Sequence, residues 1–278
     1  MNFEDFAGNI LVTCLKMGSR PWKSSFGVVL IPPLNQRMRL GTTRSWASWE
    51  SLWTLHKHPS DEVLKSVKCL LLSHDPWHRA RGADILGQFE FASKAIRFDA
   101  LSAALEVEND ERTLTSLIYS ISHLDDQRIL GKFFSLIVHP NREVRRAVAM
   151  SIDPKWGDAA VTALCTLSSD DWGGVRDWAT FKFRISDVDS TEIRQFLRAR
   201  LRDPEFQIRA EAICALAHRR DPACLKQLVD DLRNMDILED YSCHIEAAHE
   251  LIGCGPDDER PPEDLCAELL RVYPLSLT

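Results

Sequence analysis

The sequence predicts an all-α solenoid of antiparallel helix pairs, because one short segment recurs at a nearly fixed spacing and each copy carries a helical pattern. The three clearest copies read HPNREVRRAVAMSI (139–152), DDWGGVRDWATFKF (170–183) and DPEFQIRAEAICAL (203–216). Each holds a turn signal, a helix start, one arginine and an apolar run. The aligned arginines are Arg145, Arg176 and Arg209, which are 31 and 33 residues apart. A period near 33 residues is typical of helical-repeat proteins.

The same spacing continues towards the N-terminus. Steps of 33 residues back from the first of these arginines reach Arg112, Arg79 and then Trp46. Trp46 lies in a tryptophan-rich segment, residues 45–57, whose tryptophans share one face of a helix. We interpret this segment as the inner helix of a degenerate first unit with its tryptophans in the core. The alternative is an exposed aromatic anchor for a partner.

Apolar periodicity and turn residues place the remaining helices. Outer helices are expected at 60–72, 92–105, 125–137, 155–168, 189–201, 222–234 and 262–272, and inner helices at 77–88, 110–122, 142–152, 174–185, 206–218 and 243–252. The chain therefore divides into a partly irregular N-terminal cap (1–44), a repeat array (45–253) and a C-terminal cap helix (254–278). Within the first cap we expect a short helix at 3–17 and an extended piece at 26–31.

The recurring pattern D-P-x-x-x-[VI]-R-x-x-A resembles the HEAT-repeat family. The resemblance implies a right-handed superhelix of helix pairs. It also implies that the inner-helix arginine braces adjacent units by bonding to aspartates and carbonyls of the turns. The positions that match are Arg145, Arg176 and Arg209, with Arg79 and Arg112 as weaker matches. The last unit departs from the pattern, since His244 stands in place of the arginine.

A closer resemblance covers about residues 75 to 252. The segments that carry it are REVRRAVAMSI, VRDWATFKF, IRAEAICALAHRRD and IEAAHELIG. They are similar to a group of small bacterial HEAT-repeat proteins, of which one in enterobacteria is encoded beside an Rhs polymorphic-toxin gene. Such proteins are proposed to be toxin immunity proteins. Others are described as lyase-like, by similarity to the subunits that attach bilins to phycobiliproteins.

Composition narrows the classes of partner. The net charge is −7 and the pI is about 5.7, whereas a nucleic-acid-binding surface needs cations to displace counterions. The acidity argues against nucleic acid and favours a basic protein. The eight cysteines form no C-x-x-C pair, and we interpret them as buried thiols of a reduced, cytoplasmic protein. No signal peptide or membrane span is evident in the sequence. We also expect the protein to be a monomer when it is free of its partner.

No catalytic motif is evident, and we expect neither enzyme activity nor a cofactor. G-x-S-x-G, G-x-G-x-x-G and P-loop patterns are absent. His74 and His78 could share a helix face, and Glu246 and His249 form a Glu-x-x-His pair. Neither pair has the further ligands that a metal requires at matching spacing, so the sequence predicts no metal site.

The candidate binding residues lie next to the repeat arginines, at positions that we expect to face outward on the concave side. They are Asp171, Trp172, Asp177, Trp178, Glu211 and Glu246. Carboxylates from successive units together with tryptophans predict an acidic, aromatic groove for a basic protein or peptide. The alternative is that the carboxylates only solvate an exposed face and that Trp178 packs between helices.

These observations favour an interaction protein, namely an immunity protein that binds a cognate toxin or another basic protein. Two alternatives from other classes remain open at this point. One is a subunit of a bilin-lyase type of enzyme, and the other is a DNA-repair scaffold, since some alkylpurine glycosylases are built from HEAT-like repeats. A DNA-repair scaffold would require a basic concave face.

Overall fold

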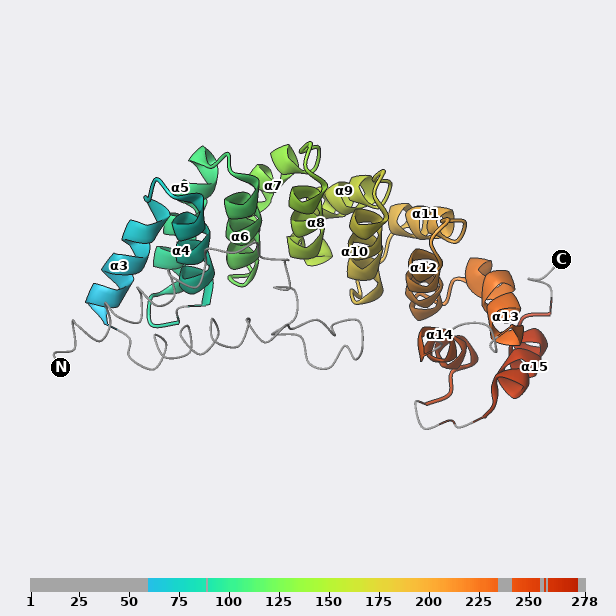
Figure 1. Ribbon diagram of the computed structural model, residues 1–278. Coiled ribbons are helices and arrows are strands. Elements are labelled where there is room, and N and C mark those ends of the chain that lie inside the picture. Colours follow the sequence, from blue (N-terminus) through green and yellow to red (C-terminus); the bar gives the residue numbers. More distant parts are fainter. Residues whose placement is uncertain (1–59, 89, 235–241, 256–257, 259, 275–278) are drawn as a thin grey trace. The chain divides into compact units, whose positions relative to one another are not determined.

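The computed structural model describes residues 60–274 except for 89, 235–241, 256–257 and 259. Within this part of the chain every regular element is a helix (Figure 1). The expected elements at 3–17, 26–31 and 45–57, including Trp46, lie outside the described residues. The chain forms two compact units, Met1–Asp126 and Gln127–Thr278. None of the described helices is both long and apolar enough to cross a membrane.

From residue 60 onward, where the structure describes it, the first unit contains two antiparallel helix pairs. The elements are α3 (Asp61–Leu71), α4 (Pro76–Gln88), α5 (Lys94–Val107) and α6 (Glu111–Ser122). Ser60, Ser93 and Asp110 cap the helices that follow them, each by accepting a hydrogen bond from a backbone N–H. The inner helices α4 and α6 pack together over fully buried aliphatic side chains such as Leu86 and Leu117.

The second unit continues the alternation of outer and inner helices. Its outer elements are η2 (Gln127–Ile129) with α7 (Leu130–Leu136), η3 (Pro154–Trp156) with α9 (Asp158–Leu167), α11 (Thr191–Arg200), η4 (Pro222–Cys224) with α13 (Leu225–Arg233), and α15 (Pro262–Val272). Its inner helices are α8 (Arg142–Ser151), α10 (Gly173–Arg184), α12 (Phe206–His218) and α14 (Ser242–Ile252). Each inner helix packs against the next, and Figure 1 shows α8, α10 and α12 side by side. The expected all-α repeat architecture is confirmed.

Three outer helices begin differently from the expected continuous form, with a 3-10 turn. In η3 and η4 a proline occupies the first position, where it loses no hydrogen bond. Asp153 and Asp221 precede these prolines and accept hydrogen bonds from Lys155 N at 2.8 Å and Ala223 N at 3.0 Å. Gly157 then separates η3 from α9 with a φ of 103°, a conformation that favours glycine.

Four of the five repeat arginines occupy one structural position, the fourth residue of an inner helix. They are Arg79 in α4, Arg145 in α8, Arg176 in α10 and Arg209 in α12. Each donates from Nη1 to two carbonyls of the turn that precedes its own helix. The acceptors are Ser73 and His74, His139 and Pro140, Asp170 and Asp171, and Asp203 and Pro204. Each guanidinium thus ties the start of its helix to the turn before it.

Three of these arginines also bind a carboxylate in the turn that precedes the next inner helix. Arg79 binds Glu108 through two nitrogens at 2.6 and 2.8 Å. Arg145 binds Asp170 at 2.6 and 2.9 Å. Arg176 binds Asp203 at 2.8 and 2.9 Å. For Arg209 the corresponding turn falls within residues 235–241, outside the described residues.

The Arg176–Asp203 pair is the most enclosed of the three. The side chain of Asp203 is 1% exposed and that of Arg176 is 10% exposed. Burial alone would raise the pKa of Asp203. The hydrogen bonds from Arg176 and from Glu205 N, with the charges of Arg176 and Arg200, outweigh burial and lower this pKa below its usual value. The carboxylate is therefore stable in its buried position only while its cationic partners are present.

The assignment of Arg112 to this series is wrong. Arg112 is the second residue of α6 and is exposed, and its guanidinium lies 3.6 Å from the ring centroid of Trp77. The fourth position of α6 is the buried Leu114, which lies 35 residues after Arg79 rather than 33. Thr113 provides a different link between the inner helices, because its hydroxyl donates to Pro76 O at 3.0 Å.

His244 also lies one position away from the arginine series, at the third residue of α14. Its side chain is buried, with Nε2 3.1 Å from Asp231 Oδ2. The imidazole stacks on Phe206 with ring centroids 5.6 Å apart and an interplanar angle of 12°. His244 thus holds α14 against α13 and the start of α12.

Replacing Gly87 with alanine should destabilise the first unit. A Cβ at Gly87 would lie 2.8 Å from Ser120 Cα and 3.0 Å from Ser120 O, which are backbone atoms of α6. Overpacking of this kind costs about 1–3 kcal/mol, and thermal unfolding monitored by circular dichroism measures it. Gly131→Ala in α7 is the control, because a Cβ there meets nothing within 4 Å. Equal effects of the two substitutions would contradict the close contact.

Arg176→Ala should destabilise the second unit by about 3 kcal/mol in urea denaturation at pH 7, because it leaves the buried carboxylate of Asp203 without its main partner. Arg209→Ala should cost less, since its two hydrogen bonds in the described structure are to carbonyls. Arg202→Ala, at an exposed position in the same turn, is the neutral control.

The Arg176→Ala deficit should depend on pH. Because the folded-state pKa of Asp203 is lowered, its pairing stabilises the fold above the ordinary pKa near 4 and is lost as the pH falls through the folded value. The wild type should therefore lose more stability than Arg176→Ala on acidification, and the two should converge. A deficit that stays constant down to pH 3 would show that the pair does not account for it.

Candidate functional site

Two of the predicted binding residues, Asp171 and Trp172, lie in the turn that opens α10. Asp171 is exposed, and its Oδ1 accepts a hydrogen bond from Arg145 Nη2 at 2.6 Å. The half-buried ring of Trp172 lies 4.7 Å from the guanidinium of Arg142 and 5.9 Å from that of Arg146. Two cations of α8 therefore cover part of the indole by cation–π contact. This turn presents an exposed carboxylate beside a partly shielded aromatic ring.

Asp177 and Trp178 follow one turn later on α10, and both are half-buried. The ring of Trp178 packs edge-on against Phe181, with centroids 5.5 Å apart and an interplanar angle of 86°. Much of the Trp178 surface is therefore committed to packing within the unit. Only the part of the Trp178 side chain that stays exposed is available for contact with a partner.

The expectation that Glu211 faces outward is wrong. Glu211 is only 1% exposed, because α12 is enclosed by α10, α11 and α14. Arg184, the last residue of α10, donates to Glu211 at 3.2 Å and to Glu246 on α14 at 2.6 Å. Arg184 thus joins three inner helices through two carboxylates. Of these, Glu246 is 60% exposed and faces solvent as expected.

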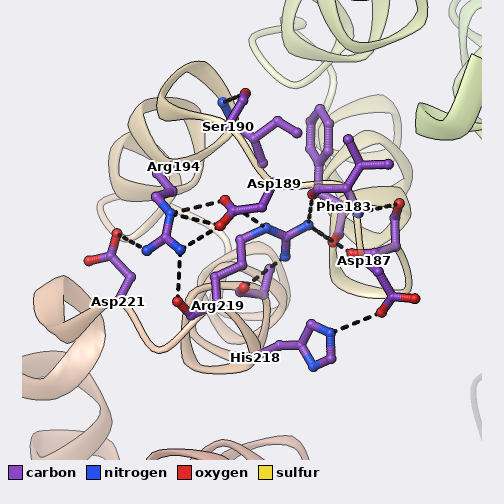
Figure 2. Close-up of polar contacts among 12 residues, drawn as sticks. Phe183, Asp187, Asp189, Ser190, Arg194, His218, Arg219 and Asp221 are labelled. Carbon is purple, nitrogen blue, oxygen red and sulfur yellow. Dashed lines mark hydrogen bonds and ion pairs between the residues drawn. The ribbon is translucent and has the colours of Figure 1, made fainter. Parts of the chain in front are cut away.

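A second polar cluster, centred on Arg219, was not predicted from the sequence (Figure 2). Arg219 follows α12, and its side chain is 3% exposed. Its Nη2 donates to the carbonyls of Phe183, Ser186 and Val188 at 2.8, 2.8 and 2.6 Å. Burial lowers the pKa of Arg219, and the neighbouring charge of Asp189 opposes this shift. The guanidinium thereby fixes the loop that connects α10 to α11.

Arg194 on α11 connects this loop to the turn after α12. It donates to Asp189 at 2.5 Å, to Asp221 at 3.4 Å and to the carbonyl of Arg219 at 2.9 Å, as Figure 2 shows. Arg198 also donates to Asp221, at 2.7 Å. Each aspartate therefore has a cationic partner, and the cluster serves the local structure of the loops.

Exposed carboxylates lie beside both clusters. Asp187, in the loop fixed by Arg219, is 90% exposed and lies 3.3 Å from the ring of His218. Glu250 on α14 lies 3.6 Å from the other ring nitrogen of His218. Together with Glu246, these acids form an acidic patch, defined here as Asp187, Glu246 and Glu250. The patch draws its residues from the α10–α11 loop and from α14.

The described cysteines do not form a nucleophilic site. The described cysteines are all free thiols, and most are buried. Burial raises the pKa of Cys165 and of Cys224 to about 12, which keeps both as unreactive thiols at neutral pH. Cys214 lies beside Arg184 and donates to the carbonyl of Cys243 at 2.7 Å.

Comparison with known proteins supports the fold and leaves the activity open. No protein-family model matches the chain. Protein YibA of Escherichia coli, from strain K12 and equally from O157:H7, is 37% identical over 108 residues, which is 39% of this chain and 38% of YibA. The match thus spans well under half the length of these relatives. The crystal structure of E. coli YibA superposes with a TM-score of 0.67 at 24% identity, over 82% of this chain and 88% of that one.

A more distant similarity links the chain to the phycocyanin lyase complex of CpcE and CpcF from Nostoc sp. PCC7120. The TM-score is 0.40 at 14% identity, over 93% of this chain and 100% of that chain. A similarity at this level carries no conclusion about function. The chain therefore has a HEAT-like helical-repeat fold and is similar in sequence to YibA.

Proposed function

We propose that this chain is a protein-binding module, and that it acts as an immunity protein which binds and neutralises a cognate bacterial toxin with a basic surface. The observation that carries the proposal is the acidic patch of Asp187, Glu246 and Glu250. These carboxylates are exposed and come from segments far apart in the sequence. Acidic groups arranged in this way accelerate encounter with a cationic partner and help to fix its orientation.

Two further features support binding. The polar clusters support two of the three acids: Arg184 donates to Glu246, and Arg219 holds the loop that carries Asp187 through three carbonyl acceptors. The exposed part of Trp178 on α10 and the partly shielded ring of Trp172 in the turn before α10 add aromatic surface. Aromatic side chains provide much of the binding energy in protein interfaces. The resemblance of residues 75–252 to proteins encoded beside Rhs toxins suggests the kind of partner.

The proposal is tested by producing the chain together with the toxin domain encoded immediately next to its gene. We expect a stable complex and survival of cells that otherwise die from the toxin. Asp187→Lys combined with Glu250→Lys should slow association at least 10-fold at low salt, because the substitutions reverse the charge that steers the basic partner. The effect should shrink as salt screens it.

A matched control carries the same change in net charge elsewhere. Asp99→Lys combined with Asp230→Lys alters two exposed positions on the outer helices α5 and α13. This control should associate with the toxin within about 3-fold of the wild-type rate, since it leaves the patch intact. Equal slowing in both double variants would reject the patch. Absence of any complex and of any protection would reject the immunity function.

A further inference from the structure

Three potential metal ligands converge where α14 ends. A ring nitrogen of His249, the sulfur of Cys254 and a carboxylate oxygen of Asp258 all lie within 4.8 Å of one another. His249 belongs to the last turn of α14, and the other two belong to the segment between α14 and α15. The group shares no residue with the acidic patch of Asp187, Glu246 and Glu250, although His249 directly precedes Glu250 on α14.

The chain reverses direction at the end of α14, which places Cys254 close to His249. Gly253 adopts a φ of 81°, which favours glycine. Its N–H donates to the carbonyl of His249 at 2.8 Å, and the N–H of Cys254 donates to the same carbonyl at 3.1 Å. This is a left-handed helix end of the kind that glycine allows. Asp258 N donates to Gly255 O at 3.1 Å.

His249 supplies an independent sign of a ligand. The residue is 7% exposed, and its Nε2 is buried without a hydrogen-bond partner among the described residues. A buried polar atom that makes no hydrogen bond costs about 1–3 kcal/mol, and each such atom in a folded protein calls for an explanation. A neutral imidazole nitrogen is also the commonest metal ligand in proteins. The histidine is therefore suited to a bond that the protein alone does not provide.

We propose that His249, Cys254 and Asp258 bind one zinc ion, with water at the fourth position. Nitrogen, thiolate and carboxylate ligands in one set suit zinc, whereas magnesium and calcium prefer oxygen alone. Ligand atoms of a tetrahedral zinc site lie roughly 3–4 Å apart, given bonds of about 2.0–2.3 Å. The three candidate atoms lie within 4.8 Å of one another, close to that spacing, and Cys254 and Asp258 are only half-buried.

Arg260 is compatible with this site. Its guanidinium donates to both oxygens of Asp258, at 3.0 Å and 2.6 Å. A carboxylate offers about four lone-pair sites, so one oxygen can bind zinc while it still accepts from Arg260. Carboxylates that bind metals are commonly held by such outer hydrogen bonds. Arg260 then fixes the direction of the Asp258 ligand.

Another group of possible ligands, Cys214, Cys243 and Glu246, does not support the same inference. Arg184 already donates to Glu246 at 2.6 Å, and its own positive charge lies beside both thiols. The sulfur of Cys214 also has a partner, the carbonyl of Cys243, at 2.7 Å. The group is thus satisfied by protein atoms, unlike His249.

The test uses the full-length, tag-free chain after treatment with a chelator. It is titrated with Zn²⁺, and in parallel with Co²⁺, whose charge-transfer absorption reports a thiolate ligand. Cys254→Ser and Asp258→Asn should each weaken zinc binding at least ~10-fold. Cys254→Ser should also remove the cobalt–thiolate band that we assign to this site. Both substitutions are at half-buried positions, and a circular dichroism spectrum verifies that each variant folds.

The control is Cys69→Ser, which changes an exposed thiol of α3 and should leave zinc affinity and the cobalt spectrum unchanged. The proposal is overturned by a chain that binds no zinc at micromolar concentrations. It is equally overturned if either Cys254→Ser or Asp258→Asn binds zinc as tightly as the wild type. Neither result bears on toxin binding, which the acidic-patch variants test separately.

Discussion

The fold depends on an arginine that satisfies two turns at once. A guanidinium carries five N–H donors in a fixed planar fork, so it can bind carbonyls on one side and a carboxylate on the other. Arg176 uses this geometry fully: it binds the carbonyls of Asp170 and Asp171 and the carboxylate of Asp203. The carbonyl of Asp203 in turn accepts from Arg209, and the carboxylate of Asp170 accepts from Arg145. Each of these two aspartates thus accepts hydrogen bonds from one arginine through its carboxylate and from the next arginine through its backbone carbonyl. We call this chain of contacts the arginine relay, and it holds successive inner helices in register.

The period and the helix bounds were predictable because they follow from local chemistry. Proline and aspartate mark the turns, apolar residues recur at helical spacing, and every expected helix that lies in the described part of the chain is present. Arg112 could not be placed by the same means. A fixed step of 33 residues assumes units of equal length, whereas the fourth position of α6 is Leu114, which lies 35 residues after Arg79 and 31 residues before Arg145. Counting a fixed period along the sequence therefore identifies the repeat architecture, but it does not give the exact position of the repeat arginine in each unit.

Glu211 and Arg219 show why the candidate site was harder to predict than the fold. Glu211 lies two residues after the arginine position, where a helix with one free face would expose it. The neighbours of α12 on several sides bury that position, and the partner of Glu211 is Arg184, 27 residues earlier. Arg219 and Arg220 are adjacent in sequence, yet only Arg219 is buried, because the loop before α11 brings three carbonyls to it. Contacts of this kind depend on how distant segments meet, which helical periodicity does not report.

Among the described inner helices of the second unit, α14 is the one without the repeat arginine. The fourth residue of α14 is Ile245, so this helix has no arginine at the position that binds the turns in the other units. His244 contributes instead to the packing of α14 on α13. Tyr273 provides one link across this junction, since its hydroxyl donates to Leu251 O at 3.1 Å. The proposed zinc site lies at the same junction, between the last turn of α14 and the segment that leads to α15. A metal bound there would cross-link the end of α14 to the segment that leads to α15, in the unit that has no repeat arginine.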